Sequence, residues 1–303
     1  MATANVEPLS GAHESIITLL SGPDLPIDLI RSAPELAQAR ARTPDRGALE
    51  RLMSEAFADH ESWTHQGVCR VCERPVEFTV DWKYSYGGTV NFREQLICPG
   101  CKLNNRLRFM AHVVLATMRA EPPLAPTYLY EQVTPFFTWA QRALPSHVIG
   151  SEYLGPDVVG GTTVRGIRHE DALALSFPDA SLCTIVSNDV FEHVSDIDRC
   201  FAECVRVLRP GGNLYFSVPF DGRLESGRRA AMRDSVVTHL LPARYHGNPL
   251  DPNGSLVFYD YGWDIIERCR GAGFADAYAL GYWSLLYGHV GAGLQLMFVA
   301  ERR

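Results

Sequence analysis

The feature that most constrains this fold is a strand, a helix and a second strand in close succession between residues 182 and 218. Leu182–Ser187 is predicted as the first strand. A helix is predicted over Asp196–Leu208, because apolar residues recur there with helical spacing: Ile197, Phe201, Val205 and Leu208. Arg209-Pro-Gly-Gly212 ends this helix, and Asn213–Val218 resumes as a strand. Such an alternation predicts a parallel sheet, because parallel strands are joined by crossover helices.

The alternation continues over residues 126–303, after the proline-rich linker 121–126. Strands are predicted at Thr127–Tyr130, His147–Glu152, Thr163–Ile167, Leu182–Ser187, Asn213–Val218, Ala275–Trp283 and Leu294–Glu301. Helices are predicted at Pro135–Leu144, Asp196–Leu208 and Tyr261–Gly271. Residues 220–260 lie between the fifth strand and the next helix, and we expect them to form a lid, because a long loop inside a compact domain is usually functional.

Two Cys-x-x-Cys pairs mark a separate unit before this domain. They provide four candidate metal ligands: Cys69, Cys72, Cys98 and Cys101. Two sulfurs three residues apart on a tight turn can bind one metal ion, and two such turns complete a tetrahedral zinc site. Because all four positions would be protein ligands, the zinc is expected to be structural. Free thiols or a redox pair are the alternative, and the other four cysteines are interpreted as core thiols.

These patterns divide the chain into three parts. Residues 1–62 are expected to form an N-terminal helical arm, and residues 63–120 the zinc-binding unit with a connecting helix over Phe109–Ala120. Residues 126–303 are expected to form the α/β domain. We call residues 63–120 the cysteine module.

The net charge of −7 argues against a strongly basic nucleic-acid or membrane surface. No apolar run reaches the length of a spanning helix, and the N-terminus resembles no secretory signal. A cytoplasmic location without membrane attachment is therefore expected. No pattern indicates an oligomeric state.

The residues after each strand are the candidates for ligand binding, because ligands of parallel sheets bind beyond the carboxyl ends of the strands. The run contains Glu-Asp-Ala at 170–172, Leu-Ser-Phe-Pro-Asp-Ala-Ser at 175–181, Glu-His-Val at 192–194 and Val-Leu-Arg-Pro-Gly-Gly at 207–212. This pattern resembles class I methyltransferases that use S-adenosylmethionine, especially those acting on small molecules. The resemblance covers residues 127–301 and implies a Rossmann-like sheet of seven strands, the last antiparallel.

The resemblance also implies the cofactor contacts. Glu152 would hold the ribose hydroxyls, with Tyr153 beside it. Asp171 would accept from the adenine amino group, and the Ala172 amide would lie on the ring. The methionine end would be lined by Asn188 and Asp189.

One segment departs from the family pattern. Class I methyltransferases usually carry a glycine-rich loop after the first strand, and this chain has Glu-Gln-Val-Thr-Pro at 131–135 instead. Thr134 is a suitable helix N-cap before Pro135. Glu131 is expected to bind the methionine ammonium, while Gln132 or Thr134 would donate to the carboxylate. The chain is similar to a bacterial subgroup with this segment, a leading Cys-x-x-Cys unit and a later His-Gly-Asn-Pro element.

The acceptor side is assigned to the lid and to the Glu-His-Val segment. His246, beside Tyr245, is the first candidate for a general base, and His193 is the second. Each histidine can equally be an ordinary turn or pocket residue. The prediction is methyl transfer to a hydroxyl or amine of a small molecule, such as a sugar or secondary metabolite.

Two other functions compete with this prediction. Methylation of rRNA or tRNA is suggested by the mildly basic cysteine module, although nucleic acid is an unexpected partner without a strong basic stripe. A non-catalytic, methyltransferase-like binding protein is suggested by the missing glycines.

Overall fold

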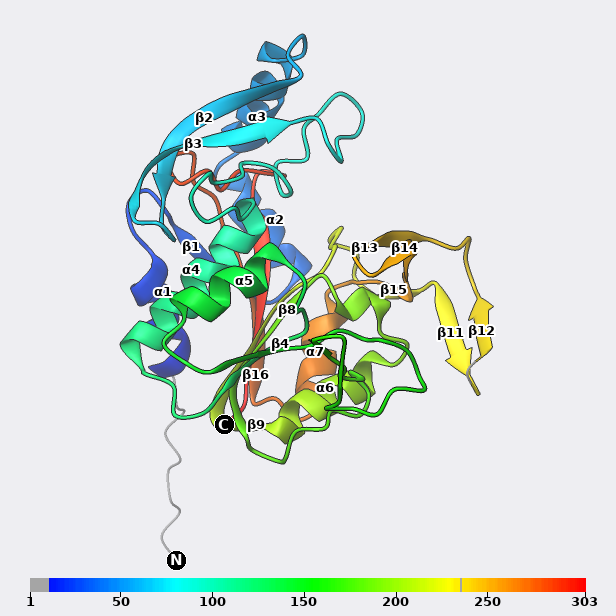
Figure 1. Cartoon of the computed structure of the whole chain (residues 1–303). Helices are drawn as coiled ribbons and strands as arrows, with labels where there is room; N and C mark the ends of the chain where they lie inside the picture. Colours follow the sequence, from blue (N-terminus) through cyan, green and yellow to red (C-terminus); the bar gives the residue numbers. More distant parts are fainter. Residues whose placement is uncertain (1–10, 235) are drawn as a thin grey trace, which may run out of the picture.

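The computed structural model describes residues 11–234 and 236–303, and a mixed seven-stranded sheet forms its centre (Figure 1). In spatial order, the strands are β1 (Ile27–Ile30), β16 (Asp276–Tyr282), β17 (Gln295–Glu301), β9 (Leu208–Ser217), β8 (Leu182–Asn188), β4 (Thr127–Leu129) and β5 (Val148–Gly150). Strands β5, β4, β8 and β9 are parallel, whereas β17 is antiparallel to β9. The predicted α/β class and the antiparallel last strand are therefore confirmed.

Helices cover both faces of the sheet (Figure 1). One face carries α1 (Gly11–Leu20), α4 (Asn105–Ala120) and α5 (Pro135–Ala143), and the other carries α2 (Ala33–Ala41), α6 (Ile197–Val207) and α7 (Asp264–Gly271). Successive strand residues face opposite layers, so Ile185 packs in one apolar cluster and Val186 in the other. Burial on both faces explains why these strands are rich in apolar residues.

Two parts of the sheet differ from the prediction. The strand expected at 163–167 is a hairpin of β6 (Thr163–Val164) and β7 (Ile167–Arg168), and the prediction of one sheet strand there was wrong. Arg165 and Gly166 both have positive φ, which suits the two-residue turn of a hairpin. Beyond β5, the parallel pairing continues as a single bridge between Glu152 and His169. The seventh strand is instead β1, which pairs antiparallel with β16. It lies within the segment expected to be helical.

The cysteine module is built on an antiparallel pair, β2 (Ser62–Cys69) and β3 (Arg74–Asp81), next to α3 (Asp45–Ala56). Residues 90–97 form an irregular segment that is joined to β3 by a Thr79–Ile97 bridge. Arg108 of α4 is buried, and it fixes the module to the domain by donating to the carbonyls of Tyr287 and Gly288, both at 2.6 Å.

The segment predicted as a lid contains three short antiparallel pairs: β10 (Gly227–Arg228) with β15 (Tyr259–Asp260), β11 (Ala230–Arg233) with β12 (Val236–His239), and β13 (Tyr245–Asn248) with β14 (Asp251–Leu256). Asp260 holds them together through ion pairs with Arg229 and Arg244, both at 2.7 Å. A short 3₁₀ helix, η1 (Phe191–His193), follows β8.

Within the described ranges, no helix combines the length and the apolar character needed to cross a bilayer.

Candidate functional site

A cavity of about 1900 Å³ lies where the strand order reverses between β4 and β8. Its walls come from the ends of these strands, from the cysteine module and from the lid. With one exception, the residues predicted for the cofactor and the acceptor line this cavity. The lining residues are Glu131, Thr134, Glu152, Tyr153, Asp171, Ala172, Asn188, Asp189, His193, Tyr245 and His246. The reversal point is where open parallel sheets bind their ligands.

Gln132 is the exception. Its side-chain oxygen accepts from the Arg168 amide at 2.8 Å, and its nitrogen donates to the Gly166 carbonyl at 2.9 Å. Both ends of this amide therefore fix the β6–β7 hairpin, and the residue is not among those that line the cavity. The structure favours a structural role over the predicted contact with the methionine carboxylate.

The start of α5 forms one wall of the cavity. Thr134 caps the helix by accepting from the Phe137 amide at 3.1 Å, as its position before Pro135 predicts. The Thr134 hydroxyl donates to Glu131, and Asn188 Nδ2 donates to Glu131 Oε1 at 2.6 Å. Burial raises the pKa of the Glu131 carboxyl despite these two bonds. The glycine-less segment thus places a buried carboxyl group at the helix N-terminus.

Glu152 stabilises the loop after β4. Its Oε1 accepts from the amides of Gln132 and Val133, at 2.7 and 2.9 Å. The strand before it approaches this loop closely, because a Cβ on Gly150 would lie 2.5 Å from the Glu131 carbonyl oxygen. The carboxylate of Glu152 therefore holds this loop in place through its backbone amides, at the position where the family pattern has a glycine-rich loop.

The neighbouring wall is formed by the segment after β7. Asp171 Oδ1 accepts from the Leu173 amide at 2.9 Å, which closes a tight turn around Ala172. Tyr153 lies across from this turn and remains 57% exposed, so its ring is accessible to a ligand.

The cysteine module contributes a second set of charges. Asp189, in a left-handed conformation with φ of 53°, receives two bonds from Arg93, both at 2.7 Å, and one from the Ser217 hydroxyl at 2.8 Å. Arg106 lies 3.5 Å from the same carboxylate, and both arginines bind Glu94. Burial alone would raise the pKa of Asp189, but the charges of Arg106 and Arg93 outweigh it and hold that pKa below its usual range.

Two polar side-chain atoms of the described residues in this region are unpaired. Arg106 Nη1 and Asn188 Oδ1 are buried, and neither finds a hydrogen-bond partner in the described part of the chain. One is a charged donor and the other an acceptor, and both residues line the cavity. Buried polar atoms are normally paired, so these two are suited to a ligand carrying both an anionic and a cationic group.

Sequence analysis did not identify Arg93, Glu94 and Arg106 as site residues. They lie 96, 95 and 83 positions before Asp189 in the chain, and they were noticed only as part of a mildly basic module. No local pattern could have signalled the contact.

The acceptor end of the cavity brings together His193 and His246, whose ring centroids are 5.1 Å apart. His246 Nδ1 lies 3.3 Å from Glu192 Oε1. Tyr245 is next to His246 on β13 and is 53% exposed. The two predicted histidines are therefore neighbours, although 53 residues separate them in the sequence.

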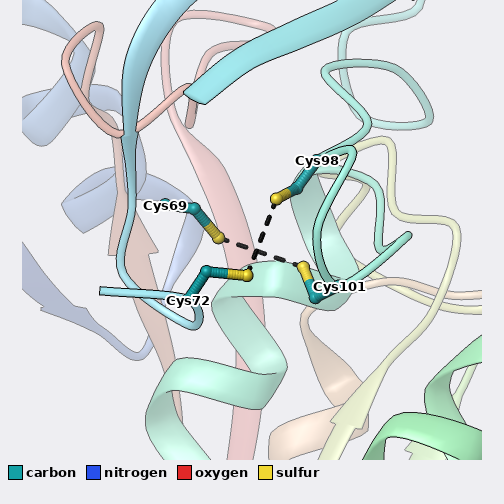
Figure 2. Close-up of side chains that lie close together, drawn as sticks. All are labelled: Cys69, Cys72, Cys98 and Cys101. Atoms are coloured by element: carbon teal, nitrogen blue, oxygen red, sulfur yellow. Dashed lines mark hydrogen bonds between the residues drawn. The ribbon is translucent and has the colours of Figure 1, made fainter. Parts of the chain in front are cut away.

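The four cysteines of the module converge (Figure 2). Sγ atoms are 3.9 Å apart in the Cys69–Cys101 pair and 3.8 Å apart in the Cys72–Cys98 pair. Four thiolates at about 2.3 Å from a tetrahedral zinc ion would lie about 3.8 Å from one another. The sulfur geometry therefore fits such an ion.

A seven-stranded mixed sheet, with helices on both faces and a cavity at the reversal point, matches the Rossmann-like fold of methyltransferases. Residues 146–216 match the family model described as a methyltransferase domain. The matched segment includes β5, β8 and α6 and most of the predicted cofactor residues.

Individual relatives match shorter or more distant parts. The chain is 38% identical over 99 residues to malonyl-[acyl-carrier protein] O-methyltransferase of Methylococcus capsulatus, covering 33% of this chain and 32% of the relative. It is 45% identical over 53 residues to a Mycolicibacterium smegmatis protein described as "Probable S-adenosylmethionine-dependent methyltransferase", covering 18% and 21%. The chain thus spans about a third or less of these curated relatives. The structure of an S-adenosylmethionine dependent methyltransferase from Mesorhizobium loti is 22% identical, with a TM-score of 0.33, covering 52% of this chain and 80% of that one.

Proposed function

We propose that this protein transfers a methyl group from S-adenosylmethionine to a hydroxyl or amine of a small molecule bound in the cavity. The observation that carries the proposal is the pair of buried, unpaired atoms, Arg106 Nη1 and Asn188 Oδ1, beside Glu131 at the start of α5. The amino-acid end of S-adenosylmethionine carries a carboxylate, which suits the charged donor Arg106 Nη1, and an ammonium group, which suits the acceptor Asn188 Oδ1.

In this proposal, side chains do the work of the missing glycine loop. The methionine carboxylate would accept from Arg106 Nη1, and the positive end of the α5 helix dipole would favour its charge. The ammonium would donate to Asn188 Oδ1 and Glu131. A cation there would favour the ionised form of Glu131, whose pKa burial raises.

The nucleoside end would lie against the segment that matches the family model. Glu152 Oε2 would accept from the ribose hydroxyls, since Oε1 already binds two amides. Asp171 and the Ala172 amide would bind the adenine, and the exposed ring of Tyr153 would lie beside the ribose.

Transfer itself needs orientation and removal of a proton. The acceptor oxygen or nitrogen forms a bond to the methyl carbon while the carbon–sulfur bond breaks, and the electron pair of that bond stays on sulfur. The acceptor proton passes to a base, for which His246 and His193 are the candidates, because both line the same end of the cavity.

The cysteine module would hold a structural zinc ion at Cys69, Cys72, Cys98 and Cys101. The sulfur spacing supports this proposal. Its consequence for activity would be indirect. By fixing the turn of Cys98 and Cys101, which lies between Arg93 and Arg106 in the chain, the ion would hold both arginines against Asp189 and the cofactor cavity.

Calorimetry with two ligands tests the cofactor proposal. S-adenosylhomocysteine has the amino-acid end, whereas methylthioadenosine lacks it. We expect the wild-type protein to prefer S-adenosylhomocysteine at least ten-fold, and Arg106→Met to lose most of this preference. Glu152→Gln should weaken the binding of both ligands to the same extent. Equal discrimination by wild type and Arg106→Met would refute the proposed role of Arg106.

A further inference from the structure

Glu192 is a buried carboxylate that the fold does not satisfy. Its side chain is 1% exposed, and within the described residues neither carboxylate oxygen makes a hydrogen bond. Its backbone is held in place, because the Glu192 carbonyl accepts from the Phe258 amide at 2.7 Å. A buried carboxylate without a hydrogen bond destabilises the fold, so a cation is expected next to it.

Two histidines face this carboxylate. His246 Nδ1 lies 3.3 Å and His193 Nε2 lies 3.7 Å from Glu192 Oε1. His193 Nδ1 lies 2.8 Å from the Leu256 carbonyl oxygen, and a carbonyl can only accept. His193 must therefore carry a proton on Nδ1, which in the neutral ring leaves a lone pair on Nε2, directed at the cluster.

The three ligand atoms have the spacing of a metal site. All lie within 4.8 Å of one another. Ligands at about 2.0 to 2.2 Å from one ion are separated by about 3.0 to 3.6 Å, close to the two distances found here. A metal-bound histidine also usually donates its second ring proton to a carbonyl or carboxylate, as His193 does.

From these contacts we propose that Glu192, His193 and His246 bind a divalent transition-metal ion at the acceptor end of the cavity. Two imidazoles and one carboxylate suit Mn²⁺, Fe²⁺, Co²⁺ or Zn²⁺ better than Mg²⁺ or Ca²⁺, which prefer oxygen ligands. This site is distinct from the cysteine cluster, which has only sulfur ligands.

The ion would also select the acceptor, and this part rests on the proposed methyl transfer. Three protein ligands leave positions open toward the cavity that all three residues line. Two adjacent hydroxyl oxygens, as in the diol of a sugar or a catechol, would fill two of them. We therefore infer an acceptor that chelates through neighbouring hydroxyl groups. The charge of the ion would lower the pKa of such a hydroxyl, so its proton would pass to water, and the two histidines would act as metal ligands in place of the general base.

Manganese binding tests the site, because Mn²⁺ competes poorly for the thiolates of the cysteine module. The purified protein, with the metal content of its cysteines retained, is treated with a mild chelator and titrated with MnCl₂ while free Mn²⁺ is followed by electron paramagnetic resonance. We expect one Mn²⁺ per chain. The near-isosteric Glu192→Gln and the variant His246→Ala should bind at least ten-fold more weakly. His239→Ala, at an exposed lid position, should bind as wild type does.

Two results would overturn the proposal: no saturable Mn²⁺ binding by the wild-type protein, or equal binding by wild type and Glu192→Gln when both are folded by circular dichroism. The cluster would then be an ion pair between Glu192 and protonated His246. Calorimetry with S-adenosylhomocysteine on the same samples separates this failure from that of the methyl-transfer proposal, because cofactor binding without Mn²⁺ binding refutes only the metal site.

Discussion

Replacing Asp189 by asparagine should destabilise the protein by about 2 to 3 kcal/mol. Asp189 is the acceptor of a two-bond ion pair from Arg93 and of a bond from Ser217, so asparagine leaves Arg93 and Arg106 to share the single carboxylate of Glu94. Removing one partner of a fully buried pair costs about 3 to 5 kcal/mol, and an exposed pair contributes about 0 to 1 kcal/mol. The side chains of Arg93 and Asp189 are 24% and 15% exposed, which places the pair nearer the buried limit.

Urea unfolding at pH 7, followed by circular dichroism, measures this cost. Glu267→Gln is the matched control, because its Arg270 ion pair lies on the surface, with the Glu267 side chain 71% exposed. It should change the unfolding free energy by about 0.5 kcal/mol or less. If Asp189→Asn costs no more than Glu267→Gln, the network does not join the module to the sheet as described.

The pH dependence adds a second test of the same pair. The pKa of Asp189 is held below its ordinary value of 3.8, so its carboxylate stabilises the fold at pH values above 3.8. That contribution is lost as the pH falls through the lower pKa of the folded state. The difference between wild type and Asp189→Asn should therefore be constant from pH 5 to 7 and shrink below pH 4.

Three further predictions address the walls of the cavity. Burial raises the pKa of Glu131 above 4.5, so its contribution to stability is present below pH 4.5 and is lost as the pH rises through the raised value. The unfolding free energy of the wild type should therefore fall relative to that of Glu131→Gln between pH 4 and pH 7. A difference that stays constant over this range would contradict the prediction. Gly150→Ala should cost about 1 to 3 kcal/mol in thermal or urea unfolding, because its Cβ would meet the Phe137 ring at 2.4 Å; Gly22→Ala, with open space around it, is the control. Cys98→Ala should release zinc, measured by elemental analysis, and weaken the binding of S-adenosylhomocysteine at least ten-fold. Unchanged affinity would show that the cysteine module does not support the cofactor site.

Local patterns predicted the centre of the fold well. The helix expected over Asp196–Leu208 is observed as Ile197–Val207, because Asp196 caps it and an apolar stripe fixes its buried face. β8 was also predicted within one residue. These elements depend on residues close together in the chain, which is the information that a single sequence carries.

Parts that depend on distant contacts could not be predicted in the same way. β1 is only four residues long, and it is a strand because β16, some 250 residues later, offers it an edge. The expected third strand became a hairpin because Arg165 and Gly166 turn the chain back on itself.

The same limit applies to the candidate site. Glu152 follows β5, and its place beyond the carboxyl end of that strand could be expected from the strand pattern. Asp171 was assigned by the family resemblance, because the strand expected before it is a separate hairpin. Arg93 and Arg106 reach the cavity only because the cysteine module folds over it. Glu192 had been considered only as part of a motif. Its burial without a hydrogen bond and its proximity to His246 depend on how the lid folds, which the sequence does not reveal.

The central claim is that this cavity binds S-adenosylmethionine without a glycine-rich loop. Isothermal titration calorimetry of the wild-type protein with S-adenosylmethionine tests it most directly. We expect saturable binding of one molecule per chain at micromolar concentration, abolished in Glu152→Ala. A folded wild-type protein that gives no binding heat at millimolar S-adenosylmethionine, by calorimetry at two temperatures, would contradict it.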